Sequence, residues 1–290
     1  MTSAETIARA RGGFRAGKWW RCPCPAHQST QASLALRDGR YALIVICHAG
    51  CSRRDILEEL RRLGLLDGRY QPAPLPDQTK AAADALRMRA YARSLWERAR
   101  LGPGSPIEAW FKTRGIDLPV PSALRWLPQC PHPSKLSCAA MVARVENVDG
   151  ELLGIRRTFL TADGQAKAAV DPVRASLGPV ASGAVRLAPL NGQFLFVGEG
   201  VETALTGIWA TGLPGWAAGD TSGLRNLILP SAVRSVVILG ERDANGASLK
   251  AARAAAERWR GEGRRVRLAW PEAGYNDIND MAQPGATHVQ

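Results

Sequence analysis

Strands and helices are predicted to alternate in the last third of the chain. Apolar runs of strand length alternate there with segments that have the apolar spacing of a helix. The predicted elements are strands at 194–197, 235–239 and 266–269 and helices at about 202–211 and 247–259. Alternation of this kind is typical of a mainly parallel sheet covered by helices. We therefore expect a multi-domain α/β protein that ends in such a sheet.

Acidic residues follow each of these predicted strands. Glu199 follows the first strand between two glycines, Glu241 and Asp243 follow the second, and Asp277 and Asp280 follow the third. Because the carboxyl ends of parallel strands lie at one edge of a sheet, we expect the carboxylates after the first two strands to surround one or two Mg²⁺ ions. An acid at such a place also commonly caps the following helix, so that alternative stays open for each of them.

Four of the six cysteines fall in the first fifth of the chain, in the segments Cys24-Pro-Ala-His27 and Cys47-His-Ala-Gly-Cys51 and at Cys22. Two close-spaced pairs of soft ligands predict a zinc site, and four protein ligands predict a structural one. The favoured ligands are Cys24, His27, Cys47 and Cys51. Cys22 and His48 remain alternatives for one position each. Cys130 and Cys138 lack a fourth ligand beside His132, so we expect free thiols there.

The chain is predicted to divide into four segments. Two short apolar runs, at 33–36 and 41–46, and an amphipathic pattern at 52–65 predict a small zinc-ribbon-like β domain. A proline-rich spacer, a long helix at 80–101, a helix at 106–113 and a hairpin turning at Asp149-Gly150 follow it. The predicted segments are a zinc-binding domain at 1–70, a linker with a connecting helix at 71–104, a basic α+β segment at 105–190 and an α/β domain at 191–290.

The charge is strongly positive, with 38 Lys and Arg against 26 Asp and Glu, a formal net charge of +12. Such a surface attracts polyanions, so nucleic acid is the first partner to consider. The sequence shows neither a signal pattern nor an apolar stretch of about 20 residues, which favours a cytoplasmic protein without a membrane partner. Basic residues precede the acidic motifs and either line a phosphate site or form a solvated face. These are Arg156, Arg157, Lys167, Arg174 and Arg186.

The acidic motifs together resemble a known domain. The segment from Glu199 to Leu205, the Glu241-x-Asp243 pair and Asn276-Asp-Ile-Asn-Asp280 resemble the Toprim domain of bacterial-type primases, topoisomerases and some nucleases. The N-terminal Cys/His cluster is similar to the zinc-binding domain of the primase branch. The segment 153–187 resembles the Toprim primases of phages, plasmids and integrated elements, so the resemblance covers nearly the whole chain.

The resemblance implies a DNA primase that joins nucleoside triphosphates into short RNA primers on a single-stranded DNA template. It implies Glu199 and Asp243 as catalytic residues and Glu199, Glu241 and Asp243 as ligands of Mg²⁺ or Mn²⁺. Because the chain ends soon after Asp280, a separate replicative helicase is the expected partner. The family usually has Asp where this chain has Glu241. That departure favours, as an alternative, a catalytically weak or inactive nucleic-acid-binding replication accessory; a Toprim nuclease is a further alternative.

Overall fold

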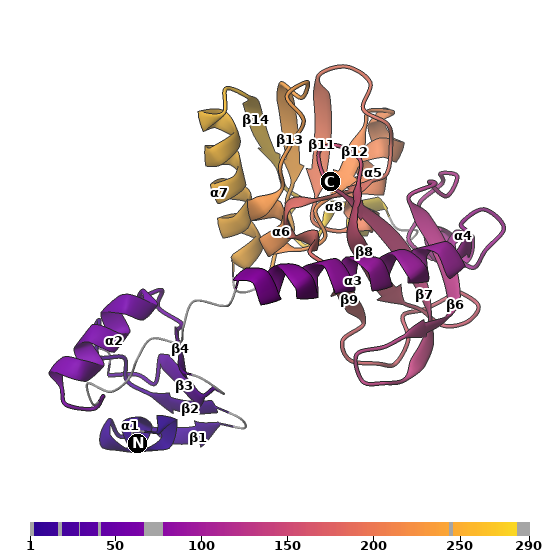
Figure 1. The fold of residues 1–290 in the computed structure, drawn as a ribbon. Coiled ribbons are helices and arrows are strands. Elements are labelled where there is room, and N and C mark those ends of the chain that lie inside the picture. Colours follow the sequence, from indigo (N-terminus) through magenta and orange to yellow (C-terminus); the bar gives the residue numbers. More distant parts are fainter. Residues whose placement is uncertain are drawn as a thin grey trace. The chain divides into compact units, whose positions relative to one another are not determined.

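The computed structural model describes residues 3–16, 19–28, 30–39, 42–66, 78–243 and 246–282 (Figure 1). The chain forms two compact units, residues 1–82 and 83–290. The division into four segments stays a prediction.

The first unit is a four-stranded antiparallel sheet with two helices. The sheet has the order β1-β2-β3-β4. Its elements are α1 (Ala4–Ala10), β1 (Phe14–Ala16), β2 (Trp19–Cys22), β3 (Leu34–Asp38), β4 (Leu43–Cys47) and α2 (Arg53–Arg62). Ser52 caps α2, since its Oγ accepts a hydrogen bond from the Asp55 N–H at 3.2 Å. The two predicted strands and the helix are confirmed; Tyr41, where one predicted strand begins, lies outside the described residues.

The second unit begins with an antiparallel sheet of five strands in the order β5-β6-β7-β8-β9. Its elements are α3 (Gln78–Arg98), β5 (Arg100–Leu101), α4 (Ile107–Thr113), β6 (Leu124–Pro131), β7 (Ser137–Glu146), β8 (Leu152–Phe159) and β9 (Arg174–Leu177). The predicted hairpin is confirmed as β7 and β8, with Gly150 at φ 81° in the turn. The predicted helix at 80–101 ends earlier, at Arg98, because Arg100 and Leu101 pair with β6 instead.

The second sheet of this unit is mainly parallel, as predicted. Its order is β10-β12-β11-β13-β14, in which only β10 is antiparallel to its neighbour. The strands are β10 (Val185–Arg186), β11 (Phe194–Gly198), β12 (Gly215–Ala217), β13 (Ser235–Leu239) and β14 (Arg265–Ala269). The helices are η1 (Val180–Ser182), α5 (Val201–Thr211), α6 (Thr221–Asn226), α7 (Ala247–Gly261) and α8 (Ile278–Ala282).

Helices cover the two faces of the parallel sheet. Trp259 of α7 packs in one buried cluster with Val236 and Ile238 of β13. On the other side of the sheet, Ala204 and Leu205 of α5 share a buried cluster with Trp110 of α4 and with residues of β6 and β7. This second cluster joins the two sheets of the unit, which brings β8 and β9 next to the end of the parallel sheet where the acidic residues lie. No helix in the described part of the chain is long and apolar enough to cross a membrane.

Candidate functional site

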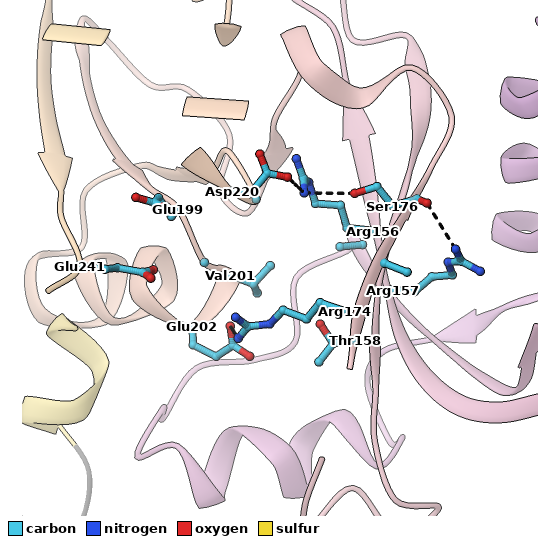
Figure 2. A pocket seen from close by; sticks show the side chains of 14 residues that line it. Arg156, Arg157, Thr158, Arg174, Ser176, Glu199, Val201, Glu202, Asp220 and Glu241 are labelled. Atoms are coloured by element: carbon cyan, nitrogen blue, oxygen red, sulfur yellow. Dashed lines mark hydrogen bonds and ion pairs between the residues drawn. The ribbon is translucent and has the colours of Figure 1, made fainter. Parts of the chain in front are cut away.

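A pocket lies between β8 and β9 on one side and the carboxyl ends of β11, β12 and β13 on the other (Figure 2). Its cavity volume is about 350 Å³. Its acidic lining residues are Glu199, Glu202, Asp220 and Glu241, and its basic ones are Arg156, Arg157 and Arg174. Carboxylates beside guanidinium groups are suited to a phosphorylated ligand that binds together with a metal cation.

Two carboxyl groups from neighbouring strand ends face the same space, Glu199 after β11 and Glu241 after β13 (Figure 2). Glu199 is only 7% exposed, and Ser248 donates a hydrogen bond to its Oε1 at 2.5 Å. Burial raises the pKa of Glu199, and the charge of Asp243 adds to the rise against the effect of the Ser248 hydrogen bond. Burial, followed by the charges of Glu199 and Asp277, raises the pKa of Glu241 to about 7. The charge of Glu199 therefore makes ionisation of Glu241 harder.

The structure gives Asp243 a capping position. Its carboxylate accepts hydrogen bonds from the backbone N–H groups of Ala247 at 2.8 Å and Ser248 at 3.1 Å, at the start of α7. It is not among the residues that line the pocket. For this residue, the helix-capping alternative raised from the sequence describes the local geometry, and a catalytic role stays a prediction.

The third acidic motif follows β14. Burial raises the pKa of Asp277, and the charge of Asp280 adds to that rise. Asp280 lies 3.5 Å from Arg114 and accepts a hydrogen bond from the Asn276 N–H at 3.2 Å. Neither acid lines the pocket, but Asp277 is close enough to Glu241 for its charge to raise the pKa of Glu241.

Sequence reasoning did not single out Asp220 and Glu202. Asp220 follows β12 and caps α6, with its Oδ1 accepting from the Gly223 N–H at 2.6 Å. The sequence Asp-Thr-Ser-Gly before a short helix carries this N-cap signal, but β12 is too short to stand out as a strand. Glu202 lies inside the first acidic motif, three residues after Glu199, and only the fold shows that its carboxylate is buried.

Two of the predicted basic residues support the wall of the pocket. Arg156 of β8 donates to Asp220 at 2.7 Å and to Ser176 Oγ at 3.1 Å (Figure 2). It also donates to the Ala218 carbonyl at 2.9 Å. Arg157 is only 6% exposed and donates to two backbone carbonyls, those of Pro131 at 2.6 Å and Ser176 at 3.3 Å. Both guanidinium groups therefore join segments of the fold beside the pocket.

The other three basic residues differ in position. Arg174 lines the pocket and lies 3.3 Å from Glu202, with 54% of its side chain exposed. Lys167 has an exposed side chain and does not line the pocket. Desolvation of its ammonium group and the charge of Arg174 both lower its pKa, so the two cations lie near each other. Arg186 lies elsewhere, with its guanidinium 4.6 Å from the ring centroid of Trp216.

The carboxylate cluster fits a divalent cation by its chemistry. Glu199, Glu241 and Asp277 all have pKa values raised by burial and by negative neighbours. A bound cation would relieve that repulsion, and carboxylate oxygens are suitable ligands for Mg²⁺ or Mn²⁺. Across the described ranges, however, three acidic side chains nowhere converge as tightly as the Cys/His ligands of the first unit.

The first unit brings the four predicted zinc ligands together. One ligand atom from each of Cys24, His27, Cys47 and Cys51 lies within 4.8 Å of the others. His27 Nδ1 is 3.1 Å from Cys51 Sγ and 3.7 Å from Cys47 Sγ, while its Nε2 lies 3.4 Å from Ser33 Oγ. Three sulfurs and one imidazole nitrogen fit the tetrahedral coordination of Zn²⁺, and a hydrogen-bond partner on the other ring nitrogen of a ligating histidine, here Ser33, is usual at such sites.

The alternative ligands lie outside this group. Cys22 is buried on β2, where burial raises the pKa of its thiol to about 11. His48 is not part of the group either. In the second unit, Cys130 and Cys138 pair across β6 and β7, while both ring nitrogens of His132 lie within hydrogen-bond distance of other partners. Within the described residues these three do not form a metal-ligand group.

Comparison with known proteins identifies the C-terminal domain. Residues 194–287 match the family model of the Toprim domain, and residues 86–187 match a family described as a domain of unknown function (DUF7146). The comparison with curated proteins found no match.

Several solved structures are similar. The zinc-binding and RNA polymerase domains of the Aquifex aeolicus primase share 16% identity at a TM-score of 0.42, covering 97% of this chain and 79% of that one. The primase fragment of the bacteriophage T7 primase-helicase protein shares 11% identity at a TM-score of 0.40, covering 90% and 93%. The DnaG catalytic core shares 12% identity at a TM-score of 0.46, covering 68% and 74%.

The family match and the observed sheet agree on the last third of the chain. The match begins at the first residue of β11 and includes β12, β13 and β14, the parallel part of the sheet, with the acidic residues at its edge. A Cys/His cluster with the donor set of zinc lies in the separate first unit. Residues 194–287 are therefore a Toprim domain, and the chain is a Toprim-domain protein that also carries a Cys/His zinc-binding unit.

Proposed function

We propose that this protein is a DNA primase, a metal-dependent nucleotidyltransferase that makes short RNA primers on single-stranded DNA. The observation that carries the proposal is the pocket in which Glu199 and Glu241 of the Toprim domain face an arginine-lined wall. The Toprim match, the Cys/His cluster and the net positive charge of the chain support it.

The reaction would join a 3′-hydroxyl oxygen to the α-phosphorus of an incoming nucleotide, with pyrophosphate leaving. Glu199 is the candidate acceptor of the hydroxyl proton, because its pKa is raised by burial. Arg174, which lines the pocket, would neutralise phosphate charge, and Lys167 near it would add to that effect, whereas Arg156 is already paired with Asp220. A Mg²⁺ or Mn²⁺ ion held by Glu199 and Glu241 would supply further neutralisation of the triphosphate.

The partners follow from the reaction. Single-stranded DNA and nucleoside triphosphates would be the substrates, and the zinc-binding unit would help to hold the template. Because duplex DNA must be opened before it can serve as a template, we propose a separate replicative helicase as the partner. The resemblance of the segment 153–187 favours a role in phage, plasmid or integrated-element replication.

Primer synthesis on mixed single-stranded DNA templates, with labelled ribonucleotides and Mg²⁺ or Mn²⁺, tests the proposal. We expect short products from the wild type and none from Glu199→Gln, which keeps the side-chain volume but removes the charge. Glu257→Gln is the matched control, because Glu257 is exposed on α7, away from the pocket lining. Equal synthesis by Glu199→Gln and wild type would refute the assignment of this site.

A second candidate function is that of a replication accessory that binds nucleic acid without making primers. It is favoured by Asp243, whose carboxylate caps α7, and by Glu241, which carries one more methylene than Asp. This candidate predicts normal DNA binding without synthesis in either metal. Synthesis that appears only in Glu241→Asp would show that the longer side chain is the cause.

A further inference from the structure

Glu202 is a buried carboxylate that the proposed reaction does not use directly. It lies in the first turn of α5 and is 4% exposed. Trp110 of α4 donates its Nε1–H to Oε1 at 3.2 Å, and Arg174 of β9 donates an Nη–H to Oε2 at 3.3 Å. Glu202 thus links the Toprim domain to two elements that precede it in the chain.

The charge of Glu202 persists despite its burial. Burial by itself favours the neutral acid, but the charge of Arg174 and the Trp110 hydrogen bond outweigh it and lower the pKa of Glu202. A buried carboxylate needs such partners, because an ionised one without them lacks the solvation that water would give it. The pair with Arg174 is therefore fixed by the fold.

Arg174 uses only part of its hydrogen-bonding capacity in the contact with Glu202. Its side chain is 54% exposed, against 5% for that of Glu202, and it lines the pocket (Figure 2). A guanidinium group has five N–H donors, of which this contact to Glu202 uses one. The positive charge of Arg174 also reaches Glu241, whose pKa it lowers against the stronger effects of burial and of its acidic neighbours.

Two carboxylates therefore compete for one cation. Glu241 lies in the cluster that fits a divalent metal and lines the same pocket as Arg174, and within the described residues it forms no ion pair of its own. If Glu202 lost its charge, the long side chain of Arg174 would be free to turn toward Glu241. The guanidinium would then occupy the place of the metal and leave the phosphate side of the pocket.

We propose that Glu202 is a positioning residue that holds Arg174 at the pocket wall, facing phosphate, and keeps it out of the carboxylate cluster. This inference rests on the proposed function for the identity of the ligands. It assigns no chemical step to Glu202, which acts only through Arg174.

Titration calorimetry on the full chain tests the proposal by measuring two affinities. One is the affinity for Mn²⁺ alone, and the other is the affinity for ATP in the presence of Mg²⁺. We expect Glu202→Gln to weaken both affinities on the order of tenfold, the scale of one charge-assisted hydrogen bond. The double variant Glu202→Gln/Arg174→Gln should regain the Mn²⁺ affinity of the wild type, because no guanidinium remains to occupy the cluster, and should still bind ATP weakly. Glu151→Gln is the matched control, since Glu151 also lies 3.3 Å from an arginine, Arg89, but is exposed.

The outcomes separate this inference from the proposed function. Wild-type affinities in Glu202→Gln, or Mn²⁺ binding that stays weak in the double variant, would overturn the positioning role even if primers are made. Conversely, the wild type could make no primers while the wild type and the two variants show the predicted order of Mn²⁺ affinities. That result would support the role of Glu202 and refute the proposed primase activity. The double variant also guards against misfolding, because it removes the buried charge and its partner together.

Discussion

Replacing Glu241 by Gln should stabilise the protein at high pH when no divalent cation is present. The pKa of Glu241 is raised from 4.5 to about 7, so the folded state holds this proton more tightly than the unfolded state does. Between these two pH values, the folded wild type binds more protons than the unfolded chain, and its stability falls as the pH rises. The loss is complete above about pH 7. Gln cannot ionise, so Glu241→Gln avoids it.

The size of the effect follows from the two pKa values. Their difference corresponds to about 3 kcal/mol in the free energy of unfolding, at about 1.4 kcal/mol for each pH unit. The unfolding midpoint of Glu241→Gln should therefore exceed that of the wild type by roughly 6 to 12 °C at pH 8. The difference should shrink to nothing below about pH 4.5, where Glu241 is protonated in both states.

Circular dichroism measures the unfolding midpoints of the two proteins at a series of pH values. The samples contain a chelator selective for Mg²⁺ and Ca²⁺. Adding Mg²⁺ well above its dissociation constant should reverse the sign of the difference at pH 8, because a cation that binds only the folded wild type stabilises it by an amount that grows with the logarithm of the free Mg²⁺ concentration. The control is again Glu257→Gln, which should follow the wild type at every pH. A Glu241→Gln variant that is no more stable than the wild type at pH 8, or whose advantage is the same at pH 5, would refute the reasoning.

Three further predictions concern other parts of the chain. Removing the metal from the Cys/His cluster with a strong zinc chelator should unfold the first unit, because structural zinc sites contribute about 10 kcal/mol or more to the free energy of folding. Circular dichroism should then show that the thermal transition of the first unit is lost while residues 83–290 stay folded. Gly219→Ala should destabilise the second unit by about 2 to 4 kcal/mol in urea unfolding, because Gly219 has a φ of 91° and a Cβ there would overlap the Arg156 guanidinium. Asp243→Ala should cost about 1 kcal/mol in the same measurement through loss of the α7 cap.

The sequence predicted the elements with strong local signals. The strands β11, β13 and β14 and the helices α5 and α7 each carry a periodic apolar pattern long enough to recognise, and all are confirmed. The short or edge elements α1, β1, β2, β10 and β12 were not predicted. A strand of three residues such as Gly215–Ala217 has no periodicity to detect and forms only because its neighbours pair with it.

The candidate site shows the same division. The sequence placed Glu199 and Glu241 at strand ends, and the structure places both at one pocket. It also grouped five basic residues by their nearness in the chain, but alternation along a strand sends neighbours such as Arg156 and Arg157 to different partners. Arg186, on another strand, packs on Trp216 away from the pocket.

By itself, the sequence determined what depends on short spacing: the two ligand pairs of the Cys/His cluster and the acids that follow apolar strands. The tertiary structure alone decided which charges meet. It paired Arg156 with Asp220 and Arg174 with Glu202, residues 64 and 28 positions apart, and turned Asp243 toward the backbone of α7. The physical reason is that a charge–charge contact depends on distance in space, and the order of the strands, which sets that distance, is fixed by packing between elements far apart in the chain.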